Sequence, residues 1–207
     1  MQDFTKFSAD KICELFSPKR ISSYDSINQH FENFDLIASI SKNLGIAEVL
    51  LRNKIDSIMR TQDSLWLDNL PIDIELELPK ESNYSRDKIV SIQSLGFWVR
   101  VIDCHKIHNQ IFSLDFLDMV DFRRYYAKNA NYLGNGARLR RYQKVSLLLN
   151  LLRNLRNCAF HFENLYKLNS NNQPRLSAKI YKSNFVINLE TDKIKVFLND
   201  LIDDLAK

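Results

Sequence analysis

The sequence predicts a mainly α-helical protein, and three observations support this fold class. Only 4 glycines and 4 prolines occur among the 207 residues, which is too few for the many turns of an all-β fold. A hydrophobic fraction of 45% excludes a disordered chain. Apolar residues recur at spacings of three and four over two long segments, as they do along a helix that buries one face. We therefore expect one helical domain over residues 1–207, with a few short strands or extended loops.

The first part of the chain is expected to form a short helix and then a long one. Residues 8–16 form the short helix, because Ser8 can cap its N-terminus and Pro18 ends it. Residues 26–60 form the long helix, since apolar side chains recur along it every three or four positions. We expect this helix to bend near Gly45.

The middle of the chain is expected to alternate short helices with loops. The segment 72–78 alternates apolar and acidic residues and is compatible with a short strand or an extended loop. Residues 86–103 and 113–128 have helical patterns, and Gly134 and Gly136 mark a loop after them.

The last part of the chain is expected to contain two helices separated by a weak hairpin. The first helix runs from 138 to 168, and short apolar segments at 180–181 and 185–189 form the hairpin. The C-terminal helix spans 191–206 and carries its apolar residues on one stripe.

Composition also bears on the location of the protein. No apolar run approaches the roughly 20 residues of a membrane span, and the residues after Met1 do not resemble a signal peptide. The three cysteines (Cys13, Cys104 and Cys158) are odd in number and scattered, which favours a reducing compartment over a disulfide framework. We therefore expect a cytoplasmic protein that does not contact membranes.

The basic residues are concentrated in one stretch. Nine of the 29 lysines and arginines lie between Phe122 and Phe162, where no acidic residue occurs, and four tyrosines lie among them. Cations bind phosphates and aromatic rings stack on unpaired bases, so the stretch is typical of a single-stranded RNA surface. A solvated basic face of packed helices is the alternative. The candidate RNA contacts here are Arg138, Arg140, Arg141, Lys144 and Arg153.

A narrow polar stripe follows the helix predicted over 138–168. Its members are spaced by three and four residues and thus share one face: Asn150, Arg153, Asn157, His161 and Asn164. Arg156 flanks this stripe. A histidine can exchange a proton near neutral pH, and an arginine can stabilise the charge of a pentacoordinate phosphorus. The set suits phosphodiester cleavage, although a solvent-facing helix can carry the same residues without any function.

The segment Arg156-Asn-Cys-Ala-Phe-His161 resembles the R-N-x-x-x-H signature of the HEPN superfamily. The wider pattern resembles its Abi-like branch, the abortive-infection proteins related to AbiD and AbiF. The segments Glu48-Val-Leu-Leu-Arg-Asn53 and Leu95-Gly-Phe-Trp-Val99 agree with that branch, and the resemblance is strongest over residues 24–168. The chain departs from the family at Asn164, where an arginine is common.

The resemblance implies a HEPN-like helical bundle whose two copies pair so that both motifs face one cleft. It implies a metal-independent endoribonuclease without a cofactor, in an antiphage abortive-infection or toxin-type system. Arg156 would stabilise the phosphorane, Asn157 would orient the scissile phosphate or the imidazole, and His161 would act as general base or acid. Attack by the ribose 2′-hydroxyl would leave a 2′,3′-cyclic phosphate and spare DNA.

The resemblance also bears on supporting residues and partners. Glu48 and Arg52 would support His161 if their helix lines the cleft, and otherwise they form a surface ion pair. RNA, a second copy of the chain, and an antitoxin or phage-derived trigger are the expected partners. The alternative function is a non-catalytic RNA-binding or protein-interaction module with the same fold.

Three further features of the sequence concern buried aromatic residues, an aromatic residue in the motif and a group of metal-ligand residue types. We expect Phe97 and Trp98 to lie in the core. Phe160 fits a dimer contact or a ring that stacks on a base, and partial burial is the alternative. Cys104 and the nearby His105 and His108 offer metal ligands, but no second cluster completes a site, so we expect no bound metal.

Overall fold

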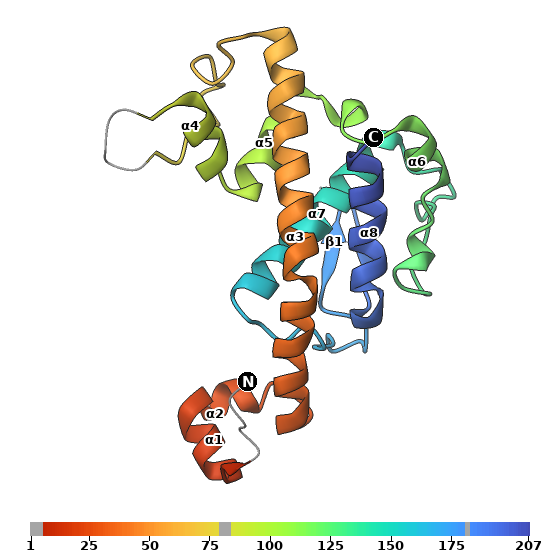
Figure 1. The fold of residues 1–207 in the computed structure, drawn as a ribbon. Helices are drawn as coiled ribbons and strands as arrows, with labels where there is room; N and C mark the ends of the chain where they lie inside the picture. Colours follow the sequence, from red (N-terminus) through yellow and green to blue (C-terminus); the bar gives the residue numbers. More distant parts are fainter. Residues whose placement is uncertain (1–5, 79–83, 181–182) are drawn as a thin grey trace.

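The computed structural model describes residues 6–78, 84–180 and 183–207 and is mainly helical (Figure 1). A single two-stranded antiparallel sheet accompanies the helices in this part of the chain. The α-helices and strands are α1 (Ala9–Phe16), α2 (Pro18–Ile21), α3 (Ile27–Gln62), α4 (Arg86–Ile92), α5 (Leu95–His105), α6 (Leu114–Met119), α7 (Arg141–Phe160), β1 (Ser177–Lys179), β2 (Val186–Asn188) and α8 (Ile194–Leu205). Short 3₁₀ turns are η2 (His108–Gln110), η3 (Phe122–Arg124) and η4 (Thr191–Lys193).

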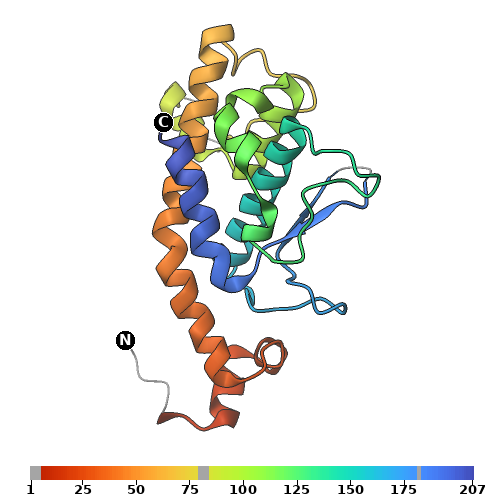
Figure 2. The ribbon, with the colours of Figure 1, turned by 90° about the vertical axis from the view of Figure 1, so that its right-hand side faces the viewer.

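Helix α3 runs along the length of the molecule, and α8 packs alongside it (Figures 1 and 2). The Ser26 hydroxyl caps α3 by accepting a hydrogen bond from the Gln29 amide, and the helix continues through Gly45 to Gln62. Its buried residues recur every three or four positions from His30 to Met59, which places them on one face. The predicted long helix is therefore confirmed, and its buried stripe also includes polar residues.

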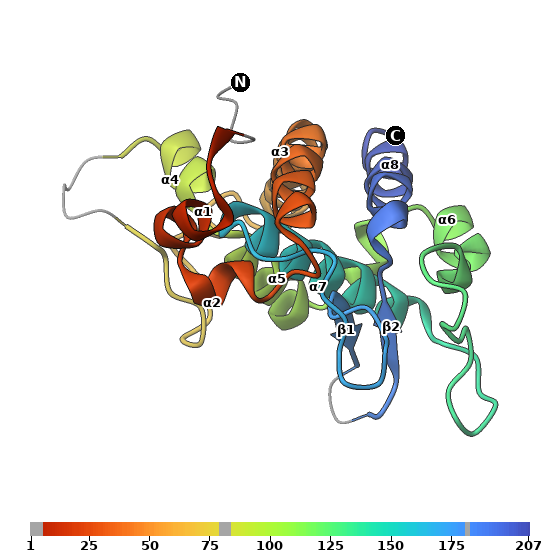
Figure 3. The same ribbon diagram turned by 90° about the horizontal axis from the view of Figure 1, so that it is seen from below.

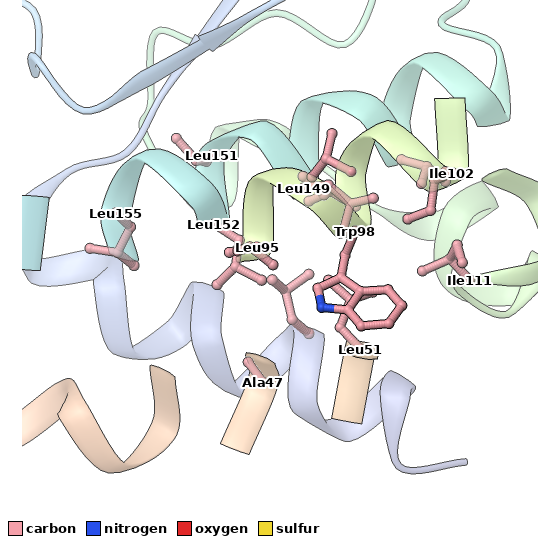
Figure 4. Close-up of a cluster of buried hydrophobic side chains, with 14 of the residues drawn as sticks. Ala47, Leu51, Leu95, Trp98, Ile102, Ile111, Leu149, Leu151, Leu152 and Leu155 are labelled. Atoms are coloured by element: carbon pink, nitrogen blue, oxygen red, sulfur yellow. The ribbon is translucent and has the colours of Figure 1, made fainter. Parts of the chain in front are cut away.

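Helices α3, α5, α7 and α8 enclose a continuous apolar core (Figure 4). Leu51 of α3, Trp98 of α5 and Leu149 of α7 are each 1% exposed or less. Phe97 and Trp98 are both completely buried, with their ring centroids 5.0 Å apart, so the prediction that they belong to the core is confirmed.

Helix α7 is shorter than the predicted segment 138–168, because it ends in a Schellman motif after Phe160. The Glu163 amide donates to the Cys158 carbonyl at 2.8 Å, and the Phe162 amide donates to the Ala159 carbonyl at 3.0 Å. Phe162 has a φ of 52°, in the left-handed region that glycine usually occupies. A non-glycine residue there costs about 1 kcal/mol or more, so contacts from elsewhere must stabilise this turn.

Two predictions from the middle of the chain were wrong in detail. The segment 86–103 forms two helices, because Ser94 caps a new helix by accepting from the Phe97 amide. The segment 113–128 forms only α6 and the turn η3, and the Asp121 side chain caps that turn through the Arg123 amide. Residues 72–78 form the loop that was the alternative to a strand.

The C-terminal part agrees more closely with the sequence pattern. Strand β2 lies within the predicted segment 185–189, whereas its partner β1 lies before the predicted 180–181, and Tyr181 is outside the described residues. Figure 3 shows this hairpin beside α7. Helix α8 follows the predicted 191–206, and its first turn is the 3₁₀ turn η4. Among the described helices, none combines the length and the apolar character that crossing a bilayer requires.

Candidate functional site

The residues of the R-N-x-x-x-H segment lie together at the C-terminal end of α7. Arg156 and Asn157 belong to its last turns, and His161 is the residue that caps the helix, with φ −93° and ψ 4°. Asn157 and His161 are exposed, and the Arg156 side chain is 32% exposed. One basic, one amide and one imidazole side chain are therefore offered at the same end of one helix.

Helix α3 contributes an acidic group to this end of α7. The Glu48 Oε2 atom lies 3.3 Å from the Arg156 Nε atom. The Arg156 guanidinium also lies over the Phe160 ring, 4.9 Å from the centroid. Arg156 thus contacts both a carboxylate and an aromatic face, and a phosphate that binds it must compete with Glu48.

Arg52 does not form the surface pair with Glu48 that was one of its two expected roles. Its Nη1 atom donates to the Ser91 carbonyl at 3.1 Å, which connects α3 to α4. Glu48 contacts the motif directly and Arg52 does not, although the two residues are one helical turn apart.

Two exposed phenylalanines flank His161. Phe160 is 51% exposed and Phe162 is 44% exposed. Both line an apolar groove of about 1320 Å³ whose other walls are α1 and the first half of α3. His161 therefore lies between two aromatic residues in the sequence, and the groove that their rings line offers a surface on which a base or an apolar side chain can be placed.

A set of side chains that sequence reasoning missed holds residues 162–165, directly after His161. Asn33 of α3 is completely buried, donates to the Glu163 carbonyl at 3.1 Å and accepts from the Leu165 amide at 2.9 Å. Arg20 of α2 donates to the Phe162 carbonyl. We call Arg20 and Asn33 the clamp residues.

Asn164 contributes to the same connection and corrects the predicted polar stripe. It lies beyond the end of α7, is 8% exposed and donates to the Ser23 carbonyl at 2.6 Å, while its Oδ1 accepts from the Tyr166 amide. In this chain, position 164 therefore faces the interior and does not present a group to a phosphate. An asparagine suits it because a side-chain amide can both donate and accept.

One signal in the sequence could have revealed Asn33. It continues the spacing of the buried residues Ile37, Ile40 and Leu44, as does His30. A polar residue in register with an apolar stripe is buried, and a buried polar residue needs hydrogen-bond partners. The partners themselves lie about 130 residues away and leave no local trace in the sequence.

Acidic residues outside the basic stretch neutralise part of its positive charge. Arg123, Arg124 and Arg141 pair with Asp121, Asp200 and Asp118, which lie outside the stretch. The Arg123 guanidinium beside Asp121 holds the pKa of that carboxyl well below its usual range. The tyrosines of the stretch divide as well, with Tyr125 and Tyr126 buried and Tyr132 and Tyr142 exposed.

Lys144 is not part of a basic surface. It is 8% exposed, its Nζ atom donates to the Leu117 carbonyl at 2.5 Å, and burial lowers the pKa of its ammonium group. Arg138, Arg140 and Arg141 lie with it at the N-terminal end of α7, and the helix rises by about 22 Å between Arg141 and Arg156. Arg153 lies near the C-terminal end, one turn before Asn157.

The cysteine and the two histidines near residue 105 do not form a metal-binding group among the described residues. The His108 Nε2 atom lies 2.9 Å from Asp103 Oδ1, and Cys104 is exposed. Over the ranges 6–78, 84–180 and 183–207, no group of three or more His, Cys, Asp or Glu side chains is arranged to hold a metal ion.

Comparison with known proteins provides no relative. No family model matches the chain, and no curated protein or solved structure matches it. The resemblance to the HEPN superfamily therefore stays a prediction from the motifs.

Proposed function

We propose that this protein is a metal-independent endoribonuclease of the HEPN type that uses Arg156, Asn157 and His161. The observation that carries the proposal is the contact between Glu48 of α3 and Arg156 of α7, at the helix end that the exposed His161 caps. It joins two segments that the family resemblance selected independently and that are 108 residues apart in the chain.

The proposed reaction needs three chemical roles. His161 takes the proton from a ribose 2′-hydroxyl, whose oxygen then attacks the adjacent phosphorus. Arg156 binds the phosphoryl oxygens while negative charge increases on them, and Asn157 orients the phosphate or the imidazole. The bond from phosphorus to the 5′-oxygen breaks, which leaves a 2′,3′-cyclic phosphate and a 5′-hydroxyl.

A second proton donor is required for the leaving 5′-oxygen. The described end of α7 offers a single histidine, so the donor in this proposal is His161 of a second copy. The homodimer with a shared cleft follows from that need and from the family resemblance. Phe160 and Phe162 would then border a cleft formed by both copies.

The biological setting in this proposal comes from the resemblance alone. An abortive-infection or toxin-type RNase damages its own cell, so an antitoxin or a phage-derived trigger would control it. The Glu48 carboxylate beside Arg156 fits such control, because it neutralises the phosphate-binding cation while no RNA is bound.

The test is cleavage of mixed cellular RNA in EDTA by the wild type and by His161→Ala, with analysis of the product ends. The matched control is His108→Ala, which removes a histidine whose ring lies 6.2 Å from that of Tyr142, in the first turn of α7. The expected result is cleavage by the wild type and the control only, leaving cyclic phosphates and intact DNA. Activity that disappears in EDTA and returns with a divalent metal would refute the metal-free mechanism.

The second candidate function is a non-catalytic RNA-binding or protein-interaction module. The half-exposed rings of Phe160 and Phe162 on an apolar groove favour it, because such a surface binds bases or apolar side chains without chemistry. Equal RNA binding by the wild type and His161→Ala, with no cleavage by either, would support this function.

A further inference from the structure

We propose that Arg20 and Asn33 are positioning residues for His161, acting through the turn that follows it. This inference rests on the proposed function, since it assigns to the first helices of the chain a role in the reaction. The clamp residues belong to α2 and α3, whereas the reacting groups belong to α7.

The Arg20 side chain makes three contacts. Its Nη2 atom donates to the Phe162 carbonyl, its Nε atom lies 3.3 Å from His30 Nε2, and its guanidinium lies 5.7 Å from the Phe34 ring centroid. His30 is completely buried among aromatic rings, so the arginine is anchored to a rigid cluster. The position of the Phe162 backbone therefore depends, through this arginine, on the positions of α2 and α3.

The turn at Phe162 depends on such contacts. A φ of 52° is unfavourable for phenylalanine, and residues in this region persist only where their surroundings impose the conformation. The Phe162 ring contacts Phe34, with centroids 5.4 Å apart, and the Phe162 carbonyl is bonded to Arg20. Both contacts come from the N-terminal helices, so these helices determine where α7 ends.

Asn33 fixes the next residues of the turn. It bonds the Glu163 carbonyl and the Leu165 amide, and its amide also donates to the Tyr24 hydroxyl at 3.2 Å. Together the clamp residues bind the backbone of three of the four residues that follow His161. The turn is thus attached to α2 and α3 over its whole length.

His161 has no comparable support of its own. Among the described residues no side-chain hydrogen bond holds its imidazole, and its amide donates to the Asn157 carbonyl at 3.0 Å, so the backbone at the start of the turn fixes where the Cα–Cβ bond of His161 points. A displacement of a reacting group by about 1 Å can reduce a rate about 100-fold. Loosening the clamp should therefore lower kcat while the RNA-binding residues stay in place.

The test uses Arg20→Ala in the full chain, with Lys19→Ala as the control that removes the same charge from an exposed neighbour. Amide hydrogen exchange at Phe162 and Glu163 should become about tenfold faster in Arg20→Ala, which corresponds to loss of one charge-assisted hydrogen bond. The kcat for RNA should fall about 10- to 100-fold with little change in KM. Arg20→Lys should recover part of kcat, because its ammonium group can donate to the Phe162 carbonyl.

The outcomes separate the clamp from the proposed function. Unchanged exchange at Phe162 and Glu163 would overturn the clamp whether or not the protein cleaves RNA. Faster exchange with unchanged kcat would overturn the positioning role and leave a structural contact only. A wild type that cleaves no RNA would overturn the proposed function and the role of Arg20 in it, while the exchange result would still report on the turn. Asn33→Ser provides a second variant with the same expectations at Glu163 and Leu165.

Discussion

Replacing Glu48 by glutamine should strengthen RNA binding, because the carboxylate competes with phosphate for Arg156. The two side chains are 21% and 32% exposed, and their charged atoms approach to 3.3 Å. Glutamine has nearly the same shape and removes only the negative charge. The variant therefore leaves the guanidinium beside Phe160 with no anion to displace when RNA arrives.

The magnitude follows from the geometry of the pair. A hydrogen bond between charged groups contributes about 1.5–3 kcal/mol, and the partial exposure of both side chains places this one near the lower limit, at about 1.5 kcal/mol. Since about 1.4 kcal/mol corresponds to a factor of ten, Kd for single-stranded RNA should fall about tenfold. The free energy of unfolding should decrease by about the same 1.5 kcal/mol, which lowers Tm by about 3–6 °C in a chain of this size.

The assay is fluorescence anisotropy with a labelled single-stranded RNA at fixed salt, in a His161→Ala background so that the probe is not cut. Asp203→Asn is the control, because it removes the same charge at an exposed position of α8 that does not line the groove. If Glu48→Gln binds RNA no more tightly than Asp203→Asn, Glu48 does not restrain Arg156 and the reasoning is refuted.

Two further predictions concern buried ionisable groups. Burial, reinforced by the charge of Arg20, lowers the pKa of His30 below its usual 6.5. As the pH falls, His30 is therefore protonated in the unfolded chain before it is protonated in the folded one. The free energy of unfolding should then decrease as the pH drops from about 7 to 5. Urea titrations should show a smaller pH slope in His30→Phe, and an equal slope would contradict this. Lys144→Met should leave RNA affinity and its salt dependence unchanged, because the ammonium group is bonded to the Leu117 carbonyl. Arg153→Ala should weaken binding and reduce the salt slope by about one, and equal effects of the two variants would contradict this.

The helices were predictable where apolar spacing is regular and capping residues are local. The stripe from Ile37 to Met59 and the cap at Ser26 together define α3, and the core positions of Phe97 and Trp98 follow from their apolar surroundings. The end of α7 was not predictable in this way, because the residues from Phe162 onward continue a helical pattern. Tertiary contacts from Arg20 and Phe34 override the local preference at Phe162.

The candidate site was likewise predictable where its residues are close in the sequence, and not where they are far apart. Arg156, Asn157 and His161 share a helix end, so the sequence placed them together, and the family resemblance pointed to Glu48 as well. Charge counted along a sequence ignores partners from other segments, such as Asp118 for Arg141, so the basic stretch has fewer unpaired cations than its composition suggests. The clamp residues were not predicted, because each forms hydrogen bonds with residues more than a hundred positions away.

The long sequence separation of the clamp has a consequence for biosynthesis. Arg20 and Asn33 leave the ribosome early, but their backbone partners at Phe162, Glu163 and Leu165 are synthesised 130 to 142 residues later. At about 5–20 residues per second, the N-terminal helices wait several seconds or longer for this connection. A nascent chain shorter than 165 residues can contain Arg156 and His161 and still lack the complete turn. The turn therefore cannot form until Leu165 has been synthesised, so a growing chain carries the R-N-x-x-x-H segment before it carries the finished site.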